Sequence, residues 1–260
     1  MTQKLIVPIK RWLAGHLPDF ILGRLDYYCR PELLDSFGGV FNGQCFRQLI
    51  YLDLTLACNF EAIVETGTFR GSTSKFLAQN SGGARVYSCE SSDRYLEFAR
   101  RRLRGIQNLS LFKLDFREFI QRLDISRQAS TFLYLDAHWE ESLPLREELD
   151  LIIREFKQFV VMIDDFEVPN DPGYGFDDYG PGKRLSLRDF ELHRDNRIAC
   201  YIPARPSAQE SGRRRGAIVL ASRSLKSKVD IVKTLIPLMP LIQSETGLPQ
   251  TRTDDCQEPT

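Results

Sequence analysis

Gly67 and Gly71 lie between an apolar, β-type run that ends in Glu65-Thr66 and a helical pattern that begins at Ser72. A glycine-rich turn between a strand and a helix lets a ligand approach bare backbone, and it directs the helix N–H groups at the polar end of the ligand. The spacing Gly-x-x-x-Gly differs from the pyrophosphate fingerprint Gly-x-Gly-x-x-Gly, and a carboxylate at Glu65 would repel a diphosphate. The turn therefore predicts a nucleotide-type site for a ligand that carries positive charge.

A second acidic residue supports this interpretation. The apolar run at 84–90 ends in Glu90, about nineteen residues after Gly71. A carboxylate at the end of a second strand can accept hydrogen bonds from both hydroxyls of a ribose. Glu65 and Glu90 together favour a cationic nucleoside.

Three aspartates end two further apolar runs. Asp136 ends the run at 131–136, and Asp164 and Asp165 end the run that begins at residue 159. If these runs form neighbouring parallel strands, the three carboxylates converge at the edge where ligands bind in open α/β sheets. Carboxylates crowded into one cleft have raised pKa values unless a cation lies between them. The cluster therefore suits Mg²⁺ or another hard divalent cation.

The glycine turn resembles the first motif, Glu-x-Gly-x-x-x-Gly, of the class I S-adenosylmethionine (SAM) methyltransferases, whose second strand also ends in an acidic residue. The resemblance extends from about Ala62 to Phe166, and more loosely to Ser222. It implies a SAM site to which several residues of this chain contribute. They are Glu65, Gly67, Thr68, Gly71 and Ser72 around the methionine end, Glu90 at the ribose, and Asp115 at the adenine amino group.

The acidic cluster resembles that of the divalent-metal O-methyltransferases of the catechol and macrolide-sugar types. In both types an acid ends the fourth strand and an adjacent pair of polar residues ends the fifth. The pair in this chain is Asp-Asp, as in the sugar-modifying enzymes, whereas the catechol enzymes have Asp-Asn. The run Leu-Asp-Ala-His-Trp at 135–139 is similar to the Leu-Asp-His-Trp of the catechol enzymes, with one inserted alanine. The resemblance implies that Asp136, Asp164 and Asp165 bind the metal and that Asp136 takes part in catalysis.

His138 is the first candidate for the general base, because the pKa of a histidine can lie near neutrality. The catechol enzymes use a lysine soon after their His-Trp. This chain has Glu140 and Glu141 there, so the base of that family does not carry over.

Each of these residues also has a structural interpretation. Acids at strand ends are common as N-caps of the next helix, which applies to Asp164-Asp165 and to Asp115. A single histidine beside a tryptophan is more often a packed residue than a catalyst. The turn at 37–44 and the loop at 168–183 could each close over a ligand or be ordinary connections.

These features lead to the hypothesis of a Mg²⁺-dependent O-methyltransferase acting on a hydroxylated small molecule. Methyl transfer from a sulfonium needs the acceptor oxygen and the methyl carbon in line, and a divalent ion would orient and acidify an acceptor hydroxyl. Two alternatives stay open because a fold does not fix a function. One is a non-catalytic binding or scaffold protein on the same fold, and the other is a metal-dependent hydroxylase or hydrolase.

The composition limits the kinds of partner that we expect the protein to bind and the cellular compartment in which we expect it. Lys+Arg and Asp+Glu both total 35, and the pI of about 6.8 leaves no positive field for nucleic acid. The six cysteines form no C-x-x-C pair and suit a reduced, cytoplasmic protein. No apolar run approaches the roughly 18 residues of a transmembrane segment, and Pro8 and Pro18 interrupt the opening residues, which do not resemble a signal peptide. The early helices could pair subunits in a homo-oligomer.

Apolar runs that alternate with helical patterns predict an α/β fold. We expect a Rossmann-like three-layer sandwich around a mostly parallel seven-stranded sheet with an antiparallel edge hairpin. The expected regions are an N-terminal helical cap at 1–58, a methyltransferase-like domain at 59–243 and a disordered tail at 244–260. The expected strands are 61–66, 84–90, 108–114, 131–136, 159–164, 197–203 and 216–222, and the expected helices are 46–58, 72–80, 92–104, 116–123 and 145–156.

Overall fold

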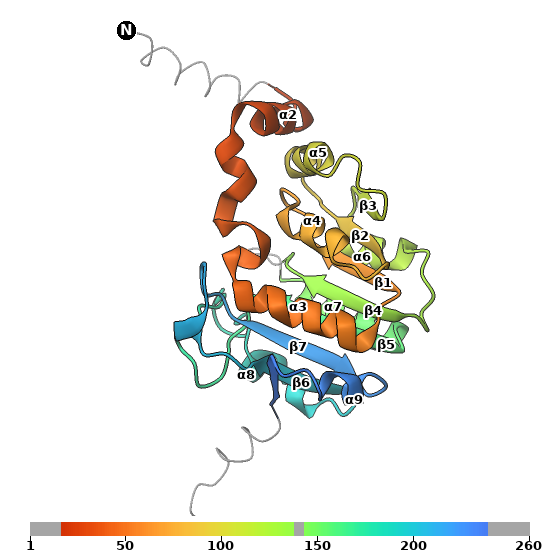
Figure 1. Cartoon of the computed structure of the whole chain (residues 1–260), viewed down its shortest axis with the longest axis vertical. Helices are drawn as coiled ribbons and strands as arrows, with labels where there is room; N and C mark the ends of the chain where they lie inside the picture. The colour runs from red at the N-terminus through yellow and green to blue at the C-terminus, as the bar shows by residue number, and fades with distance from the viewer. Residues whose placement is uncertain (1–16, 138–142, 239–260) are drawn as a thin grey trace, which may run out of the picture.

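The computed structural model of the chain describes residues 17–137 and 143–238. An eight-stranded sheet with the order β3-β2-β1-β4-β5-β7-β6-β8 runs through it (Figure 1). The first five strands in sequence pair in parallel, whereas β7 is antiparallel to β5 and β6 lies antiparallel between β7 and β8. The strands are β1 (Ala62–Thr66), β2 (Arg85–Cys89), β3 (Leu109–Phe112), β4 (Ser130–Leu135), β5 (Gln158–Asp164), β6 (Ile198–Pro203), β7 (Ala217–Ser222) and β8 (Leu235–Pro237).

Helices cover both faces of the sheet. One core cluster joins it to α3 (Cys45–Cys58), α4 (Ser72–Gln79) and α9 (Lys226–Val229), and the other joins it to α6 (Phe116–Arg122), α7 (Leu145–Glu155) and α8 (Leu187–Phe190). The other helices of the described residues are α2 (Asp19–Cys29) and α5 (Asp93–Arg102), which contact each other. The 3₁₀ segments there are η1 (Pro31–Gly38), η2 (Val40–Gly43), η3 (Leu192–Arg194) and η4 (Ser207–Gln209).

The alternation of side chains along the central strands explains the two cores. On β4, Phe132 and Tyr134 join the cluster under α3, while Leu133 and Leu135 join the cluster under α7. Because both faces are covered, these strands are apolar at almost every position, which is the pattern of a buried parallel sheet. Asp136 follows Tyr134 by two residues, so by the same alternation its side chain points to the face of the sheet that α3 covers.

The expected three-layer fold is confirmed, and every expected strand and helix is present with bounds within two residues of the prediction. Within residues 17–137 and 143–238, the sheet has eight strands and not seven. The additional strand, β8, pairs with the outer edge of β6 through Leu235, Ile236 and Pro237. A three-residue strand is too short to show an alternating pattern in the sequence.

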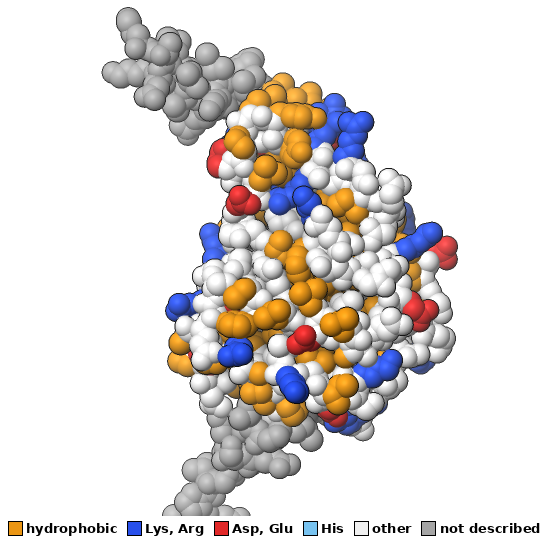
Figure 2. Space-filling view, viewed as in Figure 1, with side chains coloured by type: hydrophobic (Ala, Val, Ile, Leu, Met, Phe, Trp, Pro, Cys, Tyr) orange, Lys and Arg blue, Asp and Glu red, His pale blue; other side chains and the backbone are white. Residues whose placement is uncertain are grey.

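The N-terminal region lies along one side of the molecule. Figure 1 shows α2 beside α5 at the top, followed by a descent through η1 and η2 to α3, which lies across the front of the sheet. Figure 2 shows apolar side chains gathered over α2, where Phe20, Leu25 and Tyr28 are exposed. Residues 1–16 of the predicted cap and the predicted tail lie outside the described residues.

In the described part of the chain, we find no helix with the length and apolar character needed to cross a membrane.

Candidate cofactor and acceptor site

A cavity of about 760 Å³ lies at the carboxyl ends of β1, β2, β4 and β5. Its lining contains two of the predicted groups. One is the glycine turn together with Glu90 and Tyr95, and the other is the three aspartates together with Asp177 and Arg215. Cavities of about 300–1,000 Å³ are typical of small-molecule sites. The predicted cofactor end and the predicted metal cluster therefore belong to one cavity.

The turn at Gly67 and Gly71 brings bare backbone to this cavity. Their φ angles are +90° and +76°, in the left-handed region that favours glycine. A Cβ on Gly71 would lie 2.8 Å from Leu103, so this glycine allows the start of α4 to pack on the end of α5. Gly67, Thr68 and Ser72 line the cavity, whereas Gly71 has this packing role.

Glu65 is buried beneath the glycine turn and is not part of the cavity wall. One carboxylate oxygen accepts hydrogen bonds from the hydroxyls of Ser74 and Ser88, and the other has no hydrogen-bond partner among the described residues. Burial raises the pKa of Glu65 to about 7. Glu65 supports the turn from below, and its predicted contact with a cofactor stays a prediction.

Glu90 lies in the cavity wall at the end of β2. Its two carboxylate oxygens accept hydrogen bonds from the backbone N–H groups of Phe69 and Ser92, both at 2.8 Å. Burial raises the pKa of Glu90. A carboxylate oxygen has two lone pairs, so Glu90 keeps acceptor capacity for ligand hydroxyls.

Asp115 is exposed and is not among the residues that line the cavity. It caps α6, since its Oδ1 accepts hydrogen bonds from the backbone N–H groups of Arg117 at 2.8 Å and Glu118 at 3.1 Å. The structural interpretation accounts for these contacts, and the adenine-binding role of Asp115 stays a prediction.

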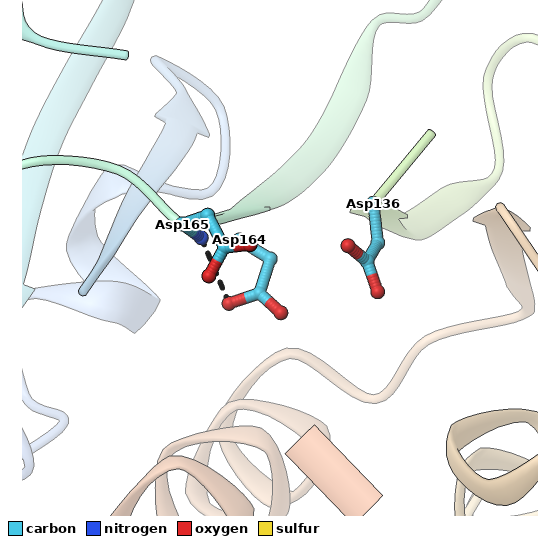
Figure 3. A group of neighbouring side chains, drawn as sticks. All are labelled: Asp136, Asp164 and Asp165. Atoms are coloured by element: carbon cyan, nitrogen blue, oxygen red, sulfur yellow. Dashed lines mark hydrogen bonds between the residues drawn. The ribbon is translucent and has the colours of Figure 1, made fainter. Parts of the chain in front are cut away.

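The three aspartates meet at the ends of β4 and β5, as the sequence predicts. One carboxylate oxygen from each of Asp136, Asp164 and Asp165 lies within 4.8 Å of the others. Figure 3 shows Asp136 at the end of one strand and the other two at the end of its neighbour, with the Asp165 N–H donating to the Asp164 carboxylate. Asp165 has φ of +53°, which turns the chain away from the sheet directly after Asp164.

Asp164 is fully engaged within the protein. Its Oδ1 accepts from the Arg47 guanidinium and from the Asp165 N–H at 2.9 Å, and its Oδ2 accepts from the Tyr134 hydroxyl at 2.7 Å and the Asn42 amide at 3.0 Å. Only 1% of the Asp164 side chain and 3% of the Arg47 side chain are exposed. Burial lowers the pKa of Arg47 and raises that of Tyr134 well above its ordinary value.

Asp165 is paired with a second arginine. Arg215 donates to Asp165 at 2.6 Å through Nε and to Asp177 through its other end. Asp177 comes from the loop at 168–183, which also contributes Tyr179 to the cavity wall. This loop therefore lies at the site, and its predicted closure over substrate stays a prediction.

Asp136 has no hydrogen-bond or ion-pair partner for its carboxylate among the residues that the structure describes. Burial, then the neighbouring charge of Asp165, raises the pKa of Asp136 well above its ordinary value. His138, the predicted base, lies outside the described residues.

The turn at 37–44 lines the cavity through Phe37, Phe41 and Asn42. The ring centroids of Phe37 and Phe69 are 5.6 Å apart, and the Arg213 guanidinium carbon lies 4.5 Å from the Phe37 ring centroid. The N-terminal region is therefore part of the cavity wall.

Sequence reasoning missed Arg47 and Arg215. Arg47 has a signal in the sequence, because it occupies the same helical stripe as the buried residues Ile50, Tyr51 and Leu54. A buried arginine on an apolar stripe needs an acidic partner. Arg215 lies in a polar run of three arginines and has no comparable signal.

Comparisons with known proteins give matches among solved structures. No protein-family model matches the chain, and no curated protein does. An O-methyltransferase from Bacillus cereus in complex with SAH is 17% identical, with a TM-score of 0.52 over 83% of this chain and 97% of that chain. A Klebsiella pneumoniae protein provisionally assigned as an O-methyltransferase is 15% identical, with a TM-score of 0.52 over 82% and 94%. Cofactor-bound Rv0187 from MTB is 17% identical, with a TM-score of 0.50 over 68% and 80%.

At these identities the likeness concerns the fold and not the activity. The parallel strand order, the antiparallel strand beyond β5 and the glycine turn at the end of β1 agree with it. The chain has the Rossmann-like fold of the class I SAM methyltransferases.

Proposed function

We propose that the chain is a SAM-dependent methyltransferase that methylates a hydroxyl group of a small molecule. One observation carries the proposal: the glycine turn and the aspartate cluster line the same cavity. A methyl donor held at the turn would present its reactive carbon to an acceptor held by the cluster. Proximity of this kind can supply a large part of the barrier reduction for a displacement reaction.

The donor end of the cavity fits a nucleoside with a positive charge. Gly67, Thr68 and Ser72 offer backbone and hydroxyl groups at the start of α4, and Glu90 offers acceptors for ribose hydroxyls. When bound, SAM supplies an electrophilic methyl group on a sulfonium. The residues of the turn position that group and surround it with a preorganised polar wall.

The acceptor end fits a compound with several hydroxyl groups. Tyr134, Asp136 and Asp177 face this part of the cavity with oxygen atoms that can accept hydrogen bonds from hydroxyls. The Asp136 carboxylate has no hydrogen-bond or ion-pair partner among the described residues, so the oxygen that does not bind an ion could take up a proton from the acceptor. His138 is retained as an alternative base.

A divalent ion would be held by fewer aspartates than the sequence suggested. Asp136 and the second oxygen of Asp165 remain available, whereas Asp164 is committed to protein donors. Mg²⁺ is commonly bound through one or two carboxylates together with waters and substrate oxygens, so Asp136 and Asp165 fit it. The ion would lower the pKa of an acceptor hydroxyl and orient it.

The cavity also bears on the alternatives. A scaffold protein that had lost turnover would be expected to fill the cleft with its own side chains, whereas this cavity keeps about 760 Å³. A metal-dependent hydroxylase or hydrolase would have no use for the glycine turn and Glu90. Product mass separates the classes, because an added methyl, an added oxygen and a cleaved bond shift it differently.

Calorimetry with SAM tests the donor site, and SAH release in the presence of a panel of catechols, sugars and other polyols tests turnover. We expect SAM to bind with and without EDTA, and turnover to require Mg²⁺. Failure to bind SAM would remove the whole proposal. Binding with turnover that is indifferent to EDTA would remove only the metal.

A further inference from the structure

Asp164 differs from its two neighbours in having its hydrogen-bonding capacity filled by the protein. The four donors come from four separate places: helix α3 (Arg47), strand β4 (Tyr134), the turn before α3 (Asn42) and the backbone of Asp165. A metal ion at Asp164 would have to displace at least one of them. Displacing a buried guanidinium would leave its charge without a partner, which is strongly unfavourable.

Arg47 is held as firmly as its partner. Besides the Asp164 carboxylate, its guanidinium donates to the backbone carbonyls of Arg215 and Gly216. The side chain lies on the buried stripe of α3, close to Ile50 and Tyr51 in the helix. The rigid helix and the two carbonyls fix the guanidinium at the strand end, so the cation is preorganised.

The charges around the cluster are consistent with this arrangement. With all four carboxylates ionised, as cation binding requires, Arg47 and Arg215 offset two of the formal charges of Asp136, Asp164, Asp165 and Asp177, and two negative charges remain among these described residues. Asp136 is the only one of these carboxylates without a described partner. Two remaining charges match one divalent cation.

We propose that Arg47 is the built-in counter-ion of Asp164, so that Asp164 is a positioning residue and a divalent ion is bound through Asp136 and Asp165. Asp164 then holds Tyr134 and Asn42 in place in the cavity wall. Helix α3 thereby completes the acceptor end of the site. The part of this inference that concerns the ion rests on the proposed function.

Titration calorimetry with MnCl₂ tests the ligand set. We compare wild type with Asp136→Asn and with the double variant Arg47→Met/Asp164→Asn, which removes both members of the buried pair. If wild type binds Mn²⁺, we expect Asp136→Asn to weaken binding at least tenfold and the double variant to stay within threefold. A tenfold loss in the double variant would make Asp164 a ligand and overturn the inference.

Urea unfolding in EDTA tests the ion pair without any metal. Each single variant, Arg47→Met or Asp164→Asn, leaves one buried group without its partner, so we expect the double variant to unfold at a higher urea midpoint than either. A double variant whose urea midpoint does not exceed that of the more stable single variant would overturn the inference. If wild type binds SAM but not Mn²⁺, the metal part of the proposed function fails. The comparison of the single and double variants in urea then decides the role of Arg47 by itself.

Discussion

Gly67 and Asp136 belong to neighbouring strand ends that are in direct contact. The Asp136 N–H donates to the Thr66 carbonyl at 3.1 Å, and a Cβ on Gly67 would lie 2.5 Å from the Asp136 carbonyl oxygen. The first residue of the glycine turn therefore rests on the backbone of the first residue of the acidic cluster. A change at Gly67 should disturb both ends of the cavity.

Gly67→Ala should destabilise the fold and abolish cofactor binding. The new methyl group meets a backbone carbonyl and the residue has φ of +90°, so both a clash and backbone strain oppose it. We expect at least about 3 kcal/mol of lost stability in urea unfolding and no measurable SAM binding by calorimetry. Gly105→Ala is the matched control, since Gly105 also has φ of +90° but nothing within 4 Å of a Cβ. It should cost about 1–2 kcal/mol with SAM binding intact; equal effects of the two variants would argue against the contact.

Asp115→Ala should affect the helix and not the cofactor. Loss of the N-cap of α6 should cost about 1 kcal/mol in urea unfolding, and we expect SAM affinity within threefold of wild type because Asp115 lies outside the cavity lining. Ser92→Ala is the comparison. Ser92 caps α5 through Tyr95 N–H and also lines the cavity, so its removal should lower both stability and SAM affinity. A tenfold loss of SAM affinity in Asp115→Ala would instead support the adenine role.

Glu148→Met should change the pH dependence of stability. Glu148 lies on α7 and is fully buried near the Thr66 hydroxyl, and burial raises its pKa to about 8. A glutamate in the unfolded chain titrates near about pH 4.3. Between that pH and about 8 the folded protein binds more protons than the unfolded protein, so its stability falls as the pH rises.

Methionine removes the contribution of Glu148 to this dependence. Between pH 5 and pH 8, wild type should lose about 2–4 kcal/mol more than Glu148→Met in urea unfolding, at roughly 1.4 kcal/mol per pH unit. Glu147→Met, which changes an exposed carboxylate one residue away, is the control and should keep the wild-type decline. Equal declines in wild type and Glu148→Met would mean that Glu148 does not carry the effect.

The parts of the fold that could be predicted are those with a local pattern. The strands β4 and β5 are buried on both faces, so they read as continuous apolar runs, and their ends are marked where Asp136 and Asp164 interrupt the apolar sequence. The parallel pairing of the two runs then places the carboxylates together. The same logic locates the glycine turn after β1.

The partners of these carboxylates could not be predicted in the same way. Arg47 and Asp164 are 117 residues apart in the chain, and no local periodicity relates them. The pairing arises because α3 packs on the face of the sheet toward which Asp164 points. The sequence predicts repulsion among three aspartates, and the structure resolves it with two arginines in positions that only the tertiary fold defines.

The last prediction concerns Phe37, which lines the cavity, packs edge-to-face against Phe69 and lies under the Arg213 guanidinium. Its side chain is 43% exposed, so Phe37→Ala should cost little stability. It should, however, open the wall beside the donor end, and we expect SAM to dissociate at least fivefold faster in stopped-flow displacement experiments. Phe20→Ala is a close match, because Phe20 is 45% exposed and Arg24 lies 5.7 Å from its ring, yet it is on α2 and outside the cavity lining. An unchanged dissociation rate in Phe37→Ala, or an equal increase in Phe20→Ala, would show that the turn at 37–44 does not retain the cofactor.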